Sequence, residues 1–163
     1  MKKAIYLLFI LISIFIFTGC NNDTKKYSSD GLSITMKKGL VKKYNANGLY
    51  YEDNDIFFIA NFDDFEDLIE ADINSDSTIE EYTKLIFENQ GSSYNIITKD
   101  NFTYFTYEYT NNEGSEDSIT YYYLTSVHKS SKGFWITTFG CQKANQLIYA
   151  DKFIEWSKTI EVK

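Results

Sequence analysis

The segment 102–139 constrains the fold more than any other part of this chain. It contains three runs rich in threonine and aromatic or branched residues, at 102–109, 119–124 and 134–139. These residue types favour extended strands because their side chains fit a pleated surface. The short polar intervals between the runs predict three consecutive antiparallel strands. Both alternating faces are apolar enough to need cover, which predicts a sheet with helices on its faces.

Alternation along a strand divides these side chains between the two faces. One expected face holds Phe105, Tyr107, Tyr109, Tyr121, Tyr123, Trp135 and Phe139. The other expected face holds Phe102, Tyr104, Tyr122, Leu124, Phe134 and Ile136.

Two helices are expected around this block. The residues from Ser77 to Glu80 have the form of a capping box, and apolar residues then recur at helical spacing until Gly91. A second helix is expected over 143–157. Shorter strands are expected at 31–36, 49–52, 56–62, 94–98 and 159–162. The order is three strands, a helix, four strands, a helix and a strand, which predicts one α+β domain over 31–163.

Residues 1–19 predict a secretory signal peptide. Lysines precede a 14-residue apolar run at 4–17, which is short for a membrane span. The residues at 17–20, Phe-Thr-Gly-Cys, resemble the bacterial lipobox, with phenylalanine where leucine is usual. That resemblance implies lipidation of Cys20, and the polar residues 20–30 predict a lipidated tether. We therefore expect a lipid-anchored protein on the extracytoplasmic side of the cell membrane.

The net charge of the chain argues against some partners. The whole chain carries −7, and loss of Lys2 and Lys3 with the signal leaves 14 lysines against 23 acids, close to −9. An acidic domain repels phosphate groups, so neither nucleic acid nor an anionic lipid surface is expected as a partner.

The cysteines and the single histidine give little sign of catalysis. If Cys20 carries lipid, Cys141 has no disulfide partner and is expected to be a small buried apolar residue. A catalytic pair of Cys141 with His128 would require the two side chains to meet across neighbouring strands. The sequence has no glycine-rich phosphate loop, zinc motif or GxSxG elbow. We expect no enzymatic activity; an enzyme using Cys141 or the carboxylates at 63–67 is the alternative.

The order of elements resembles that of the PsbP/Mog1-like family, which includes the bacterial DcrB-type proteins. The residues that carry the resemblance are the opening 31–40, the helix at 78–91 and the closing run 134–162. The resemblance implies an α/β/α sandwich, in which an antiparallel sheet is covered by helices on both faces. It also implies an accessory subunit or assembly factor without enzymatic activity.

The loop at 72–80 is a candidate cation site. Asp72, Asn74 and Asp76 place oxygen ligands at alternate positions, as the first half of an EF-hand loop does. Ser77 stands where that loop needs glycine, and Thr83 stands where it needs glutamate. A capped helix start in an acidic loop explains the same residues without metal, so weak Ca²⁺ binding is the alternative hypothesis and no cofactor is expected.

Tyrosines on the sheet are candidates for an interaction surface. Aromatic faces stack and phenols form hydrogen bonds, whereas tyrosines on a covered sheet belong to the core. The candidates for exposure are Tyr50, Tyr51, Tyr107, Tyr109 and Tyr122. The leading hypothesis is a membrane-anchored, non-enzymatic interaction or accessory module with a protein partner in the cell envelope. The alternative is a protein that binds a ligand or divalent cation through the acidic loop.

Overall fold

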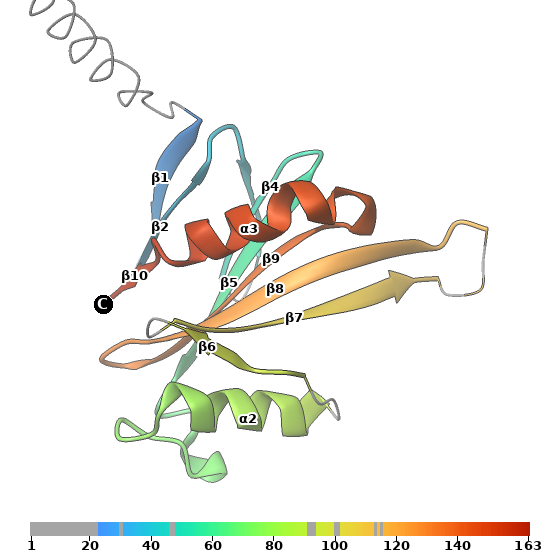
Figure 1. Ribbon diagram of the computed structural model, residues 1–163. Coiled ribbons are helices and arrows are strands. Elements are labelled where there is room, and N and C mark those ends of the chain that lie inside the picture. The colour runs from blue at the N-terminus through green and yellow to red at the C-terminus, as the bar shows by residue number, and fades with distance from the viewer. Residues whose placement is uncertain are drawn as a thin grey trace, which may run out of the picture.

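The structure is a computed structural model that describes residues 23–29, 31–45, 48–90, 94–99, 102–112, 114 and 116–163. The expected signal peptide 1–19, Cys20 and the expected end of the first helix at Gly91 lie outside the described residues. The described residues form an α+β fold of antiparallel sheets with two α-helices (Figure 1). Among them, no helix is both long and apolar enough to cross a membrane.

Seven strands form the larger sheet. They are β3 (Val41–Lys43), β4 (Gly48–Glu52), β5 (Ile56–Asp64), β6 (Ile97–Lys99), β7 (Phe102–Asn111), β8 (Ile119–Lys129) and β9 (Gly133–Gln142). Their spatial order is β3-β4-β5-β9-β8-β7-β6, and each neighbouring pair is antiparallel. The block 102–139 thus forms three consecutive antiparallel strands, as predicted. Figure 1 shows β7 and β8 continuing together as a long hairpin.

A smaller sheet lies at the start of the described chain. It contains β1 (Thr24–Ser29), β2 (Leu32–Lys37) and β10 (Glu161–Val162), in the order β1-β2-β10. Strand β1 pairs with β2 along its whole length, from Thr24 opposite Lys37 to Ser29 opposite Leu32.

This pairing corrects the prediction that 20–30 is a tether and that the domain starts at residue 31. Tyr27 anchors the polar segment, because its ring is buried and its hydroxyl donates to the Lys37 carbonyl at 2.9 Å. The same hydroxyl accepts a hydrogen bond from the Leu40 amide at 3.2 Å. One buried aromatic residue and a paired backbone therefore hold a strand whose other side chains are polar.

Helix α3 (Gln146–Ser157) follows the 3₁₀ turn η2 (Lys143–Asn145) and packs against one face of the larger sheet. Phe153 is fully buried, with its ring centroid 4.9 Å from that of Phe139 on β9. The smaller sheet adds Ile34 and Met36 to the same core. Burial of these apolar side chains holds α3 and both sheets together.

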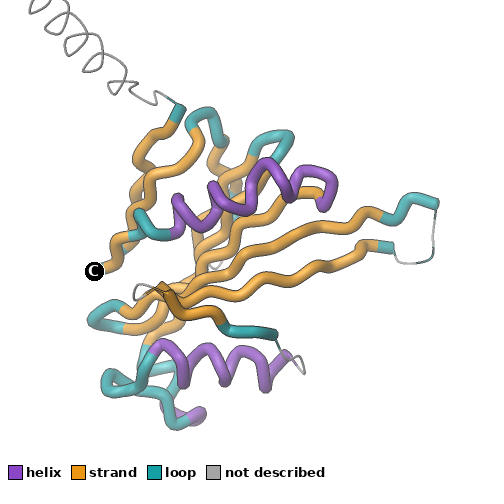
Figure 2. Tube along the Cα trace, viewed as in Figure 1, coloured by secondary structure: helices purple, strands orange, loops and turns teal. Residues whose placement is uncertain are grey.

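Helix α2 (Ile79–Gln90) and the 3₁₀ turn η1 (Ile69–Ala71) lie near the other face of β9. The Tyr82 ring stacks on Phe134 with centroids 4.2 Å apart and planes 4° apart. Phe87 contacts Phe105 of β7, with centroids 4.7 Å apart. Figure 2 shows α2 and α3 well apart, with strands of the larger sheet between them.

The register between β8 and β9 corrects the predicted division of side chains between the faces. Tyr123 lies opposite Gly140, and Leu124 lies opposite Phe139. Directly opposite residues of antiparallel strands share a face. Phe139 and Trp135 therefore lie on the α3 face with Leu124. Side chains alternate between the faces within each strand, as predicted. The length of the turn determines which residues of two neighbouring strands share a face.

Candidate interaction surface

Four partly exposed rings form a continuous row across the α2 face of the larger sheet. We call Tyr50 (β4), Phe57 (β5), Tyr123 (β8) and Tyr107 (β7) the aromatic row. The ring centroids are 6.4 Å apart from Tyr50 to Phe57, 5.7 Å to Tyr123 and 4.8 Å to Tyr107. The last two rings are stacked, with planes 4° apart. Because each ring touches the next, the row is a preformed surface rather than a set of separate side chains.

Strand β9 crosses the aromatic row at Gly140. A Cβ atom at this position would overlap the ring of Phe57. The absent side chain lets the Phe57 ring lie across β9 and reach Tyr123 on the far side. Gly140 is therefore required for a continuous row.

The aromatic row continues toward the end of the β7–β8 hairpin. Tyr121 lies beside Tyr123, with ring centroids 6.3 Å apart, and is directly opposite Tyr109. Tyr109 is 58% exposed, and Ile119, two residues before Tyr121, is 40% exposed. We call the row together with Tyr109 and Tyr121 the aromatic surface. It runs from β4 to the projecting hairpin seen in Figure 1.

A hollow of about 310 Å³ opens where the aromatic row meets the β4–β5 turn. The Tyr50 hydroxyl in its wall donates to the Glu52 carboxylate. Burial and this hydrogen bond raise the pKa of Tyr50 to about 12. Burial also raises the pKa values of Tyr107 and Tyr123. The phenols consequently stay protonated at neutral pH. Tyr50 uses its hydroxyl hydrogen in the bond to Glu52, but its oxygen can still accept a hydrogen bond beside the apolar ring faces.

Three of the five predicted tyrosines lie on the aromatic surface, namely Tyr50, Tyr107 and Tyr109. The prediction was wrong for Tyr51 and Tyr122, which are 7% and 6% exposed. Both point to the α3 face, where they join the apolar core. Phe57, Tyr121 and Tyr123 also belong to the aromatic surface but were not predicted as candidates. Alternation could have identified Tyr121 and Tyr123, because it places them on the same face as Tyr107 and Tyr109 of β7.

The predicted calcium ligands lie in the loop before α2. Asp72 has a left-handed backbone with φ of 57°, and the Asn74 Oδ1 accepts a hydrogen bond from the Asp76 amide at 2.8 Å. In the described part of the chain, no group of three or more histidine, cysteine, aspartate or glutamate residues is arranged to hold a metal ion. Ca²⁺ binding by this loop stays a prediction.

A cationic side chain of the protein itself already contacts this loop. The Lys129 ammonium donates to the backbone carbonyls of Ser75 and Ser77, at 2.6 and 2.7 Å. Carbonyl oxygens are also the ligands that calcium loops direct at the metal. Lys129 thus takes up two of the oxygen ligands that this loop could offer to a cation.

The suggested pair of Cys141 and His128 does not form. Cys141 lies opposite Tyr122 and His128 lies opposite Trp135, so the two are separated along the strands by about 20 Å at 3.3 Å per residue. Burial raises the pKa of Cys141 to about 11 and lowers that of His128 to about 4. The thiol is therefore protonated and the imidazole neutral at pH 7.

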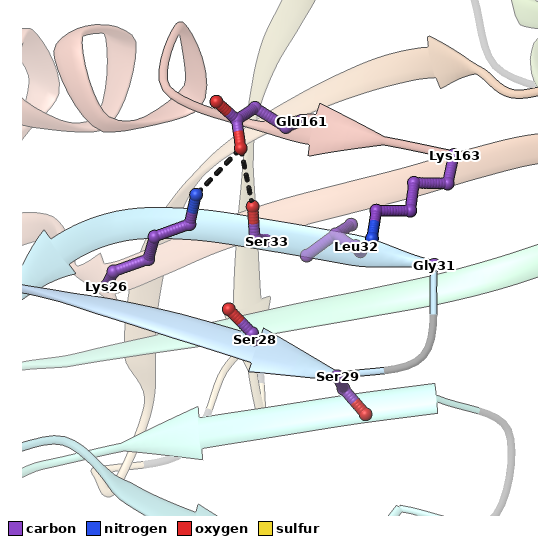
Figure 3. A pocket seen from close by; sticks show the side chains of 8 residues that line it. All are labelled: Lys26, Ser28, Ser29, Gly31, Leu32, Ser33, Glu161 and Lys163. Carbon is purple, nitrogen blue, oxygen red and sulfur yellow. Dashed lines mark hydrogen bonds and ion pairs between the residues drawn. The ribbon is translucent and has the colours of Figure 1, made fainter.

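Two further hollows flank the smaller sheet. One, of about 230 Å³, lies across β1, β2 and β10 (Figure 3). In it, the Lys26 ammonium and the Ser33 hydroxyl both donate to the Glu161 carboxylate, at 2.7 and 3.0 Å. Lys26 and Ser33 lower the pKa of Glu161 by these contacts. The second hollow is a cleft of about 540 Å³ between β2 and α3.

Comparison with known proteins shows a likeness of fold. No family model matches the chain, and no curated protein matches it. A Bacteroides thetaiotaomicron VPI-5482 protein, known from a crystal structure at 1.50 Å resolution, is similar with a TM-score of 0.58 and 13% identity. The match covers 86% of this chain and 49% of that chain, so this chain spans about half of its length.

A second similar structure is the solution structure of cyanobacterial PsbP (CyanoP) from Synechocystis sp. PCC 6803. It has a TM-score of 0.52 and 12% identity, and the match covers 91% of this chain and 99% of that chain. At such identities the likeness concerns the fold alone. The described residues and these comparisons together show that the chain has a PsbP-like fold.

Proposed function

We propose that this protein is an extracytoplasmic lipoprotein, anchored through Cys20, that acts as a non-enzymatic interaction or accessory module in the cell envelope. The aromatic surface carries the proposal, because it gathers six aromatic side chains of four strands on one face. The lipobox-like residues 17–20 support the anchor.

The aromatic surface has the properties of a protein-binding site. Tyrosine is enriched in the centres of interfaces because its ring buries apolar area while its hydroxyl forms hydrogen bonds. The rings of Tyr107 and Tyr123 support each other by stacking, so little side-chain freedom is lost when a partner docks. Tyr109 offers the most exposed ring of the surface.

The α/β/α sandwich is part of the same proposal. Helix α3 packs on the face of β9 that carries Phe139, and α2 packs near Phe134 on its other face. In this arrangement α2 covers only one end of the sheet face on which it packs. The aromatic surface occupies the rest of that sheet face. A partner protein can cover it there, as a helix would.

Affinity purification from crosslinked native membranes tests the interaction. The proposal predicts a discrete partner with the wild-type chain and its loss when Tyr109→Ser and Tyr121→Ser are combined. Tyr44→Ser is the matched control, because Tyr44 is 90% exposed outside the aromatic surface. Equal recovery of the partner with all three proteins would refute docking at this surface.

The variant Cys20→Ala tests the anchor separately. Without the thiol the chain cannot receive lipid, so the proposal predicts that the protein leaves the membrane fraction and loses its membrane partner. An unchanged distribution between the membrane and soluble fractions would contradict lipidation at this residue. The aromatic variants, by contrast, should remain in the membrane fraction.

A further inference from the structure

One end of the smaller sheet lies close to the proposed lipid anchor. Only residues 21–23 separate Cys20 from Thr24, the first residue of β1. Four residue steps of extended chain reach at most about 14 Å. Thr24 lies opposite Lys37, and the Lys38 amide donates to the Asp23 carbonyl at 2.9 Å. An anchored chain must therefore hold the Lys37–Lys38 end of β2 near the membrane surface.

The cleft of about 540 Å³ lies at this end of the sheet. Asp23, Thr24, Lys37 and Lys38 line it from the smaller sheet. Helix α3 contributes Tyr149, Lys152, Glu155 and Trp156. The cleft thus combines lysine ammonium groups with the edges of two largely buried aromatic rings, and it has two acidic residues among its lining groups.

Two of the lysines are placed by neighbouring groups. The Lys37 ammonium lies 2.6 Å from the Asp53 carboxylate and 3.0 Å from that of Asp55. Although burial lowers the pKa of Lys37, these two carboxylates raise it above its ordinary value. The Lys152 ammonium lies 5.4 Å from the centroid of the Tyr149 ring. Two carboxylates thus hold the Lys37 ammonium at the cleft, and the Lys152 ammonium lies over the Tyr149 ring.

Lysines are concentrated in the stretch of sequence that follows the proposed anchor. Residues 23–45 contain six lysines and two aspartates, which gives +4, whereas the chain as a whole carries −7. Exposed charges farther apart than about 8–10 Å are largely screened at physiological ionic strength. Four of these six lysines also pair with nearby carboxylates: Lys26 with Glu161, Lys37 with Asp53 and Asp55, Lys38 with Asp23, and Lys43 with Glu52. A membrane close to β1 and β2 therefore meets these ion pairs rather than the distant acids of the domain.

We propose that the cleft between β2 and α3 seats the phosphate headgroup of an anionic lipid in the membrane that carries the anchor. This inference rests on the proposed lipidation of Cys20. The Lys38 ammonium, which lies 3.6 Å from the Asp23 carboxylate in an exposed ion pair, exchanges that partner for the phosphate oxygens, and the Lys152 ammonium binds them from α3. Trp156 and Tyr149, each 8% exposed, add an apolar part to the lining of the cleft. This proposal differs from the expectation that net acidity excludes an anionic lipid surface as a partner.

The test uses the full, lipid-modified chain in vesicles. Glu155→Cys places a reporter thiol in the cleft, and a water-soluble maleimide measures its accessibility. Vesicles contain phosphatidylcholine alone or with phosphatidylglycerol. We expect labelling to be several-fold slower with phosphatidylglycerol. A reporter at Lys84→Cys on α2 should react equally in both, and the chain without a reporter gives the background from buried Cys141.

Variants that remove lysine charges test whether the slower labelling of the reporter thiol arises from binding in the cleft. Lys38→Gln combined with Lys152→Gln should restore fast labelling of the reporter in phosphatidylglycerol vesicles. Lys42→Gln combined with Lys132→Gln is the matched control, because these exposed lysines lie outside the cleft, and it should leave protection intact. Equal labelling in the two lipids, or equal effects of the two double variants, would overturn the proposal.

Two further measurements distinguish binding of a lipid headgroup from binding of free phosphate and from absence of the lipid anchor. Protection by inorganic phosphate in phosphatidylcholine vesicles would indicate a site for free phosphate and would overturn the assignment to lipid. Flotation with vesicles is measured before labelling. A chain that does not float lacks the anchor, which refutes the proposed lipidation and this inference together, whereas a chain that floats without protection refutes this inference alone.

Discussion

At the scale of single residues, Gly140 determines whether the aromatic row is continuous. The variant Gly140→Ala should force the Phe57 ring away from β9 and lower the free energy of unfolding by about 1–3 kcal/mol, as overpacking does. Denaturant unfolding measures the change. In a Phe57→Ala background the same substitution should cost much less, because the overlapping ring is gone. An equal cost in both backgrounds would show that Phe57 does not lie over Gly140.

His128 makes the stability of the protein depend on pH. Burial lowers its pKa to about 4 in the folded chain, against about 6.5 when unfolded. Its contribution to stability is present above pH 6.5 and is lost as the pH falls toward 4, because the unfolded state binds the proton first. The loss reaches about 3 kcal/mol, at about 1.4 kcal/mol for each pH unit between the two values. His128→Gln should remove this part of the acid sensitivity, as unfolding at several pH values will show; identical pH profiles would contradict the assignment.

At the scale of elements, α2 begins one residue later than its sequence predicts. The Thr78 hydroxyl accepts a hydrogen bond from the Glu81 amide at 3.2 Å, and the Glu81 carboxylate accepts one from the Thr78 amide at 2.7 Å. This is the reciprocal pattern of a capping box, formed by Thr78 and Glu81. The overlapping pattern from Ser77 to Glu80 has the same residue types, so composition alone could not decide between the two.

If Thr78 and Glu81 form the capping box, substitutions at Thr78 and at Glu80 should have unequal effects on the free energy of unfolding. Thr78→Ala should lower the free energy of unfolding by about 1 kcal/mol, because an amide at the start of α2 loses its acceptor. Glu80→Gln should change it by less than about 0.5 kcal/mol, because the exposed pair with Lys84 contributes little. Thermal or denaturant unfolding distinguishes them. A larger effect at Glu80 would support the pattern predicted from the sequence.

The loop before α2 should be insensitive to calcium. Because Lys129 binds the carbonyls of Ser75 and Ser77, millimolar Ca²⁺ should leave the Tm unchanged. Lys129→Met should lower stability by about 1–3 kcal/mol through the unpaired carbonyls, whereas Lys132→Met should have little effect. A rise in Tm with Ca²⁺ in the wild-type chain would instead favour the hypothesis of a cation site at Asp72, Asn74 and Asp76.

The sequence predicted the existence of the main elements better than their orientation. Residue composition located β7, β8, β9 and both α-helices. In α3, however, the apolar residues Leu147 and Ile148 are 98% and 55% exposed. The buried stripe is Tyr149, Phe153 and Trp156, at the same helical spacing. The helix is apolar on a wide arc, so its pattern could not show which part faces the sheet.

At the scale of the whole molecule, the aromatic surface depends on features that the sequence shows only in part. Tyr50 and Tyr51 are adjacent in one strand and must point to opposite faces, but only the tertiary contacts decide which face α3 covers. For the same reason, Tyr122 was wrongly predicted as a candidate for exposure. Strand β1 was missed because its side chains apart from Tyr27 are polar and give no periodic signal, although it pairs with β2, the next strand along the chain.

The fold arranges two surfaces at different ends of the molecule. Figure 1 shows the end of the β7–β8 hairpin far from the start of β1. In our proposal, the start of β1 lies at the membrane and the hairpin projects away from it. Tyr109 and Tyr121 near the hairpin end would then face partners at a distance from the bilayer.

Site-specific crosslinking in intact membranes tests whether a partner docks at the aromatic surface. A photoreactive amino acid replaces Tyr109 or Tyr121, and the same group at Lys84, exposed on α2, is the control. Our account predicts one discrete adduct of the same size from positions 109 and 121 and none from position 84. An adduct of equal yield from position 84, or the absence of adducts from both tyrosine positions, would contradict docking at the aromatic surface.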